Sequence, residues 1–188
     1  MVIEPASNPC GRLARLVLLA TLLVSTGCSA MPQSSLFATF PWKRSHAAAG
    51  QSTLSPEVRE VLTAARGLVG VPYRYGGTSR QTGVDCSGML NLAFQEALGV
   101  TLPRRAVDLS KLGTPVRREQ LQPGDLVFFN TLGRPFSHAG LYVGNGEFIH
   151  AASRGPERSV TVSRLDEPYY ASCFQGARRL PLAGIRPS

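Results

Sequence analysis

The sequence predicts an α+β domain in which helices come first and an antiparallel sheet follows. Two segments with apolar residues at helical spacing, beginning near residues 55 and 85, precede several short apolar segments after residue 123. The dipeptide Asn145-Gly146 separates two of these short segments, and it is a strong signal for a β-hairpin. Helices followed by a run of strands are typical of the α+β class.

The first predicted helix begins after Ser55, which is a favourable N-cap, with Pro56 at the first helical position. Apolar residues then recur at helical spacing, and Gly70 can close the helix. These residues are Val58, Val61, Leu62, Ala65 and Val69. The next segment, residues 72–82, contains three Gly or Pro residues and is predicted to be a loop.

The second predicted helix begins near Asp85 and ends at Gly99. Its expected buried face consists of Met89, Leu90, Ala93, Phe94, Ala97 and Leu98. A turn at residues 123–125 then leads into the first of the predicted strands. These strands are residues 126–129, 139–143, 148–151, 160–162 and 177–180.

The composition indicates a folded, basic protein. Of 188 residues, 43% are hydrophobic and 17% are charged, which is enough apolar content for one core. The net charge is +8 and the pI is near 9.9, which favours anionic surroundings. Nucleic acid, acidic lipid and an anionic polymer such as the bacterial wall all fit this charge.

The N-terminal segment reads as an export signal. Arg12 and Arg15 precede the apolar run 16–24, which suits a secretory signal and is too short to span a bilayer as a helix. Small residues then lead to Cys28, as in bacterial lipoprotein signals, in which the Cys is lipidated. Ser25 departs from that pattern, and an ordinary cleaved signal with an incidental Cys28 is the alternative. Export makes nucleic acid a poor partner.

These features predict a division of the chain into a signal peptide (1–27), a lipid-anchored tether (28–54), a domain (55–183) and a short tail (184–188). Ser29 follows the predicted lipidation site where an Asp would favour retention at the inner membrane. For an organism with two membranes, we therefore expect an outer-membrane location facing the periplasm.

The candidate nucleophile is Cys86. If Asp85 caps the second helix, Cys86 lies in its first turn, where free N–H groups and the helix dipole stabilise a thiolate. The small residues Ser87 and Gly88 would let a substrate approach, and the Cys86 N–H could face an oxyanion. The alternatives are a buried structural cysteine or a disulfide between Cys86 and Cys173.

His138 and His150 are the only histidines in the predicted domain. A two-residue hairpin would place Gly144 opposite Glu147, so that the two histidines lie on neighbouring strands three residues out of register. The geometry of the turn then decides whether they share a face. Two satisfied core or surface histidines, or a zinc site with Cys86, are the alternatives, although no metal-ligand spacing supports zinc.

The sequence resembles the NlpC-type cell-wall cysteine endopeptidases, and in particular their small periplasmic lipoprotein members. Six segments in the same order carry the likeness: Pro72–Gly77, Asp85–Gly88, Leu102–Arg104, Pro123–Phe129, His138–Gly144 and Phe148–Ala151. The resemblance implies a papain-like fold, with the Cys helix packed on the sheet that carries the His. It also implies that Cys86 is the nucleophile, His138 the base and His150 the residue that orients it.

Three further residues complete the implied site: Tyr73 near the nucleophile, with Asp85 and Ser87 around the substrate and the oxyanion. Members of the family cut stem peptides of peptidoglycan, either between D-glutamate and a diamino acid or at diaminopimelate–D-alanine crosslinks. Arg74, Arg80, Arg104 and Arg105 are candidates for contact with the carboxylates of these peptides.

The expected partners are peptidoglycan and the membrane, reached through the lipid anchor, and an adaptor or regulatory protease is a further candidate. No cofactor or metal is expected. Two other functions remain open from the sequence: a wall-associated lipoprotein scaffold with an idle cysteine, and a papain-like acyltransferase or amidase that acts on another amide.

Overall fold

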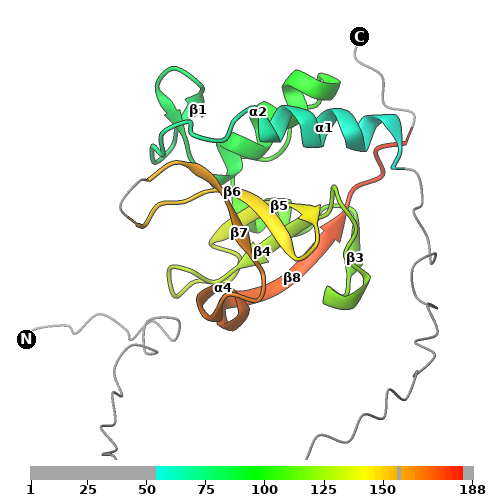
Figure 1. Cartoon of the computed structure of the whole chain (residues 1–188), viewed down its shortest axis with the longest axis vertical. Helices are drawn as coiled ribbons and strands as arrows, with labels where there is room; N and C mark the ends of the chain where they lie inside the picture. The colour runs from blue at the N-terminus through cyan, green and yellow to red at the C-terminus, as the bar shows by residue number, and fades with distance from the viewer. Residues whose placement is uncertain (1–53, 156–157, 184–188) are drawn as a thin grey trace, which may run out of the picture. The chain divides into compact units, whose positions relative to one another are not determined.

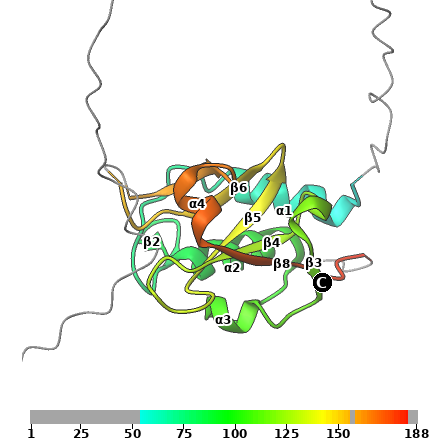
Figure 2. The ribbon, with the colours of Figure 1, turned by 90° about the horizontal axis from the view of Figure 1, so that it is seen from below.

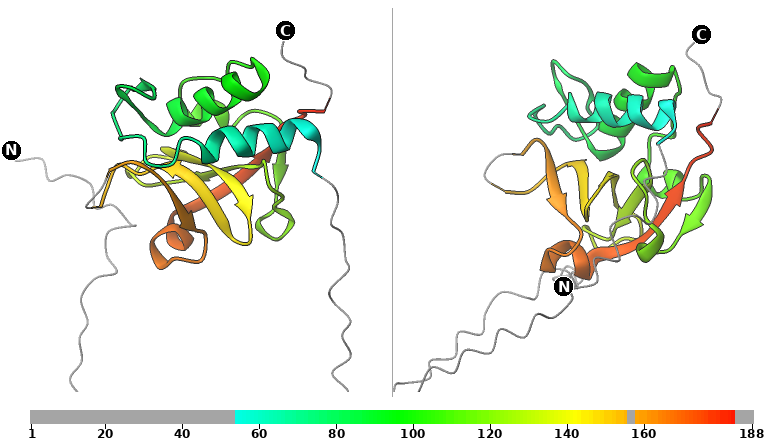
Figure 3. Two further views of the ribbon diagram at one scale, coloured as in Figure 1. Left: turned by 45° about the horizontal axis from the view of Figure 1, so that its top comes forward. Right: turned by 45° about the vertical axis from the view of Figure 1, so that its right-hand side comes forward.

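The computed structural model describes residues 54–155 and 158–183, which form a helical layer packed on an antiparallel sheet. Helices α1 (Pro56–Arg66) and α2 (Cys86–Leu98) pack on each other and cover one face of the sheet (Figures 1 and 3). The short α3 (Ala106–Leu109) follows α2, and α4 (Pro168–Cys173) lies on the other face, nearest the viewer in Figure 2. The predicted α+β class is confirmed.

The main sheet has six strands in the order β3-β8-β4-β5-β6-β7, and every neighbouring pair is antiparallel. Its strands are β3 (Thr114–Val116), β4 (Leu126–Phe129), β5 (His138–Gly144), β6 (Glu147–Ala151), β7 (Val160–Arg164) and β8 (Phe174–Arg179). The five predicted strands are all present. The sequence did not indicate β3, the 3-10 helix at Arg118–Gln120, α3 or α4, because each is short and carries little periodicity.

Local sequence signals predicted where the two long helices begin. Ser55 accepts a hydrogen bond from the Val58 N–H, and Asp85 accepts one from the Gly88 N–H, so both predicted N-caps are confirmed. Gly99 closes α2 in the left-handed region, also as predicted. The end of α1 was predicted too late, because the helix stops at Arg66 and Val69 is 48% exposed. The buried residue of that turn is Leu68.

The predicted loop at residues 72–82 contains part of a small two-stranded sheet, β1 (Thr78–Ser79) with β2 (Gly83–Val84). Arg80 ties this hairpin to the helices. Its guanidinium donates to both carboxylate oxygens of Glu96 on α2 and to the carbonyl oxygen of Gly67 after α1. The hairpin therefore supports the loop that leads into α2.

The central strand β4 is buried on both faces. Leu126 and Phe128 join the core beneath α1 and α2, whereas Val127 and Phe129 join a second apolar cluster on the opposite face. Side chains alternate between the faces of a strand, so cover on both sides accounts for the continuous apolar run LVFF. The second cluster also contains Phe148 and residues of α4.

A β-bulge in the β5–β6 hairpin corrects the predicted register. Gly144 pairs with Glu147 as expected, but Leu141 pairs with Ile149 rather than with His150. Val143 is the extra residue, and it lies directly before Gly144, whose φ is +101°. Continued along the strands, this register places His138 two residues out of register with His150 instead of three. An even offset puts both histidines on the same face.

The predicted signal peptide, the lipidation site at Cys28, almost all of the tether and the tail lie outside the described residues. Within the described part of the chain, no helix is both long and apolar enough to cross a membrane.

Candidate active site

Cys86 is the first residue of α2 and lies where the helical layer meets the start of β5. Its thiol accepts a hydrogen bond from the N–H of Ala139, so the sulfur lies against the peptide unit that joins His138 to Ala139. The N–H groups of Cys86 and Ser87 also point toward the sulfur. First-turn N–H groups have no partner within a helix, so these two remain available to an oxyanion.

Burial of the thiol raises the pKa of Cys86, and the nearby carboxylate of Asp85 raises it further. The N–H groups of Ala139, Ser87 and Cys86 oppose this effect and lower the pKa, but burial is the larger cause. The thiolate expected from the position of Cys86 at the helix N-terminus is therefore not the favoured resting form. We infer that the resting site holds a neutral thiol.

The structure brings His138 and His150 together. His138 Nε2 lies 2.9 Å from His150 Nδ1, and the two rings are perpendicular. His138 is 7% exposed and His150 is 1% exposed. Because Nε2 of His138 is occupied by His150, its other nitrogen, Nδ1, is the one left for exchange of a proton with Cys86.

Burial keeps both histidines neutral. It lowers the pKa of His138 to about 4, against a smaller opposite effect from the Asp85 carboxylate. The pKa of His150 is also lowered, first by burial and then by the neighbouring His138. When both imidazoles are neutral and share one hydrogen bond, one of the two facing nitrogens must carry a proton and donate it. The other must be unprotonated and accept.

Asp85 is the centre of a hydrogen-bond network at the start of α2. One carboxylate oxygen accepts from the Gly88 N–H at 2.6 Å, and the other accepts from the Gly76 N–H at 3.0 Å. The guanidinium of Arg104 spans both oxygens at 3.2 and 3.1 Å. The Asp85 carboxylate thus connects the loop before β1 and the segment after α2 to the helix that carries Cys86.

Ser87 and Gly88 are small for a reason different from the predicted one. The Ser87 side chain is buried, and its hydroxyl donates to the Arg104 carbonyl oxygen at 2.6 Å. A Cβ at Gly88 would overlap the carbonyl oxygen of Gly77. Both residues therefore allow close packing of loops around α2, and the Ser87 hydroxyl points into that packing.

Tyr73 lies close to Cys86 and Asp85, as the resemblance implied. Its phenol pKa is raised by partial burial and then by these two neighbours, while Arg158 lowers it. The Tyr73 N–H donates to the carbonyl oxygen of Arg158, and its backbone forms a bridge with Val84. The phenol is thus held beside Cys86 by backbone contacts on both sides.

Two residues that sequence reasoning missed complete the surroundings of the histidines. Ser163 Oγ lies 3.1 Å from His150 Nε2, and the Tyr170 hydroxyl lies 3.2 Å from the same nitrogen. Neither residue lies in a conspicuous motif. The one available signal was the alternation of β7, which places Ser163 on the same face as Thr161, the residue paired with His150.

Two alternatives to a catalytic cysteine are not supported by the described residues. Cys86 is a free cysteine, so the Cys86–Cys173 disulfide is absent. Within residues 54–155 and 158–183, no group of three His, Cys, Asp or Glu side chains is arranged to hold a metal ion. Cys86, His138 and His150 therefore do not form the zinc site considered from the sequence.

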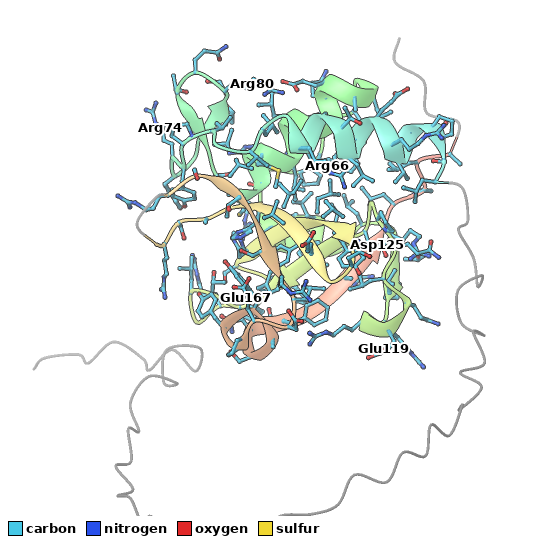
Figure 4. The ribbon with its side chains drawn as sticks, viewed as in Figure 1. Arg66, Arg74, Arg80, Glu119, Asp125 and Glu167 are labelled. Carbon is cyan, nitrogen blue, oxygen red and sulfur yellow. The ribbon has the colours of Figure 1, made fainter. Side chains whose placement is uncertain are left out.

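The four arginines named for substrate contact have different surroundings. Arg80 binds Glu96 and Gly67, and Arg104 binds Asp85, so both stabilise the protein itself. Arg105 is exposed, with Asp108 at 3.8 Å. Arg74 and Arg80 lie at the β1 end of the domain, opposite the end that carries Glu119 and Glu167 (Figure 4).

The model of the NlpC/P60 family matches residues 70–179, which is more than half of the chain and contains every residue of the site described above. The chain belongs to the NlpC/P60 family. Membership agrees with the observed α+β architecture and confirms the resemblance found in the sequence.

Two curated relatives that resemble the chain are named as a hydrolase and an endopeptidase. A γ-DL-glutamyl hydrolase of Bacillus subtilis is 38% identical over 141 residues, which cover 73% of this chain and 33% of the relative. The murein DD-endopeptidase MepH of Escherichia coli is 42% identical over 115 residues, covering 60% of this chain and 42% of MepH. The chain thus spans less than half the length of these two relatives.

Solved NlpC/P60 structures share the fold. A family member from Bacillus cereus superposes with a TM-score of 0.59 at 35% identity, covering 65% of this chain and 39% of that one. The peptidoglycan hydrolase RipB of Mycobacterium tuberculosis gives a TM-score of 0.56 at 31% identity, covering 66% and 64%. The NlpC/P60 domain is therefore the part of the chain for which the likeness holds.

Proposed function

We propose that this chain is a cysteine endopeptidase that hydrolyses amide bonds in the stem peptides or crosslinks of peptidoglycan. The observation that carries the proposal is the His138–His150 hydrogen bond, formed beside a free Cys86 thiol at a helix N-terminus. The names of the relatives, murein DD-endopeptidase and peptidoglycan hydrolase, support the substrate class.

The proposed reaction begins with a neutral thiol. Cys86 attacks the scissile carbonyl while its proton moves to Nδ1 of His138, and a tetrahedral oxyanion forms near the N–H groups of Cys86 and Ser87. The C–N bond then breaks as the His138 imidazolium protonates the leaving amine. Water, deprotonated by His138, hydrolyses the thioester and regenerates the Cys86 thiol.

His150 supports this cycle from the far side of His138. Its Nδ1 lies 2.9 Å from His138 Nε2, and in the proposed scheme His150 Nδ1 accepts the His138 Nε2–H, which leaves Nδ1 of His138 free to act as the base. A hydrogen-bonded partner also stabilises the imidazolium that forms during the reaction. In this scheme His150 orients the base and does not touch the substrate.

The test compares the full chain, purified in detergent, with its Cys86→Ala variant on defined diaminopimelate-containing muropeptides, both crosslinked and uncrosslinked. Mass spectrometry identifies the products. Loss of the crosslinked dimer with the wild type alone would establish a DD-endopeptidase, whereas cleavage of the uncrosslinked stem after D-glutamate would assign the other bond. If the two chains give the same products, or if the wild type with an alkylatable Cys86 gives none, the proposal fails.

We also propose that the mature protein is lipidated on Cys28 and anchored in the outer membrane, facing the periplasm. The support is the apolar run 16–24 followed by small residues and Cys28, with Ser29 next. Intact-mass measurement of the membrane-extracted protein, beside a Cys28→Ala variant, tests this proposal. An unmodified N-terminus at any residue other than 28 would contradict it.

A further inference from the structure

The second ring nitrogen of His150 lies between two hydroxyl groups. Ser163 on β7 contributes one at 3.1 Å from Nε2, and Tyr170 on α4 contributes the other at 3.2 Å. His150 itself is on β6, so three separate elements converge on one nitrogen. The catalytic scheme above makes no use of these two hydroxyls.

The aromatic cluster around His150 holds the Tyr170 hydroxyl in place. The Tyr170 ring packs edge-on against His150, with centroids 5.3 Å apart, and against Phe148 at 4.9 Å. The ring of Phe148 in turn lies 4.8 Å from that of His150. Because the phenol ring is fixed on two sides, its hydroxyl remains directed at the imidazole.

The position of one proton depends on these hydroxyls. If His150 Nδ1 accepts the Nε2–H of His138, then neutral His150 must carry its own proton on Nε2. That N–H is buried and needs an acceptor, and the oxygens of Ser163 and Tyr170 are placed to provide one. Without an acceptor, the buried Nε2–H would be unsatisfied, and the tautomer with the proton on Nδ1 would gain population.

The alternative tautomer would disable the base. With a proton on His150 Nδ1, the hydrogen bond to His138 could form only if His138 Nε2 were the acceptor. Neutral His138 would then carry its proton on Nδ1, the nitrogen that faces the thiol in the proposed reaction. A protonated Nδ1 cannot accept the proton of Cys86.

We propose that Ser163 and Tyr170 are positioning residues that hold His150 in its Nε2–H tautomer, so that His138 presents an unprotonated Nδ1 to Cys86. The proposal rests on the catalytic scheme above for the direction of the His138–His150 hydrogen bond and for its consequence, and on the observed contacts for the place of the two hydroxyls. A cavity of about 30 Å³ adjoins both histidines and Tyr170, which is room for at least one water molecule. A single substitution could therefore be rescued by water, so the double variant is decisive.

The experiment measures the tautomer directly in the full chain, in detergent and without substrate. Histidine is labelled with ¹⁵N, and two-dimensional proton–nitrogen spectra report which ring nitrogen of His150 carries hydrogen, with His138→Gln used for assignment. The variants are Ser163→Ala, Tyr170→Phe and the double variant, while Ser163→Thr keeps a hydroxyl. Tyr142→Phe is the matched control, because it loses a phenol that accepts from the Gly146 N–H in the hairpin turn of the same sheet, whereas the hydroxyls beside His150 Nε2 are those of Ser163 and Tyr170.

The expected result is an Nε2–H signal for His150 in the wild type, in Ser163→Thr and in Tyr142→Phe, and a loss of that signal in the double variant. On muropeptides we expect kcat of the double variant to fall about 10- to 100-fold, with KM changed by less than roughly twofold. Retention of the Nε2–H signal and of kcat in a folded double variant would overturn the proposal.

The proposal and the endopeptidase function can fail separately. The rate at which iodoacetamide alkylates Cys86, measured by peptide mass spectrometry, needs no wall substrate. If the wild type cleaves no muropeptide, a slower alkylation and an altered tautomer in the double variant would still support the role of Ser163 and Tyr170. Unchanged alkylation and an unchanged tautomer would reject it, whatever the substrate.

Discussion

Arg104 places its guanidinium across the carboxylate of Asp85, with N–O distances of 3.2 and 3.1 Å. Asp85 caps α2 directly before Cys86, while Arg104 lies beyond the end of that helix. The same guanidinium also donates to the Ser87 hydroxyl. The pair therefore fixes the first turn of α2, whose N–H groups surround the Cys86 sulfur.

Replacement of Arg104 by Ala is expected to lower kcat by about 10-fold, because release of the Asp85 carboxylate loosens the first turn that presents the thiol. Arg104→Lys should restore little of the activity, since an ammonium group cannot span both oxygens. Arg105→Ala is the matched control, because Arg105 is 77% exposed at its side chain and only approaches Asp108. Equal losses in Arg104→Ala and Arg105→Ala would contradict this role.

The acid limit of activity should reflect the buried His138. Because burial lowers its pKa to about 4, His138 stays unprotonated and able to act as the base down to that pH. Because protonated His138 cannot act as the base, we expect kcat/KM to fall about 10-fold per pH unit below about pH 4. Between about pH 5 and 7, titration of His138 should not change kcat/KM. Circular dichroism at each pH separates loss of activity from unfolding. An acid limb centred near 6.5 in folded enzyme would show that His138 titrates as a solvated histidine.

Asp125 contributes to stability rather than to catalysis. It is 1% exposed and binds Arg179 on β8 through two bonds of 2.8 Å, while accepting the Gln122 N–H. Asp125→Ala should lower the free energy of unfolding by about 2 kcal/mol, less than for a fully buried pair because Arg179 is partly exposed. Urea unfolding measures this change. Asp166→Ala, which removes the exposed partner of Arg164, should leave the urea midpoint unchanged, and an equal effect of both variants would contradict the assignment.

Gly88 should tolerate no side chain. The added Cβ of Gly88→Ala would meet the Gly77 carbonyl oxygen and come within 3.2 Å of the Asp85 carboxylate, and backbone cannot yield as a flexible side chain can. We expect a large loss of kcat together with a lower melting temperature, even though alanine favours helices. Gly99→Ser, at the left-handed C-cap of the same helix, has open space around it and should cost stability with activity retained. A fully active Gly88→Ala would show that the Gly77 loop is free to move.

Much of the fold was predictable because its signals are local. Ser55 and Asp85 cap helices through hydrogen bonds to residues three positions ahead, and Gly99 ends α2 in a conformation that glycine adopts readily. The apolar run LVFF predicted a strand, and Asn145-Gly146 predicted the hairpin. Each of these depends on a few consecutive residues.

The sequence by itself determined the candidate residues for the chemistry: one cysteine at the start of a helix and two histidines on neighbouring strands. Tertiary structure decided how they work together. The bulge at Val143 placed both histidines on one face, burial favoured neutral groups over the expected thiolate, and β7 and α4 brought Ser163 and Tyr170 to His150. Strand register, desolvation and contacts between distant segments depend on the packing of the whole domain, which local pattern does not encode.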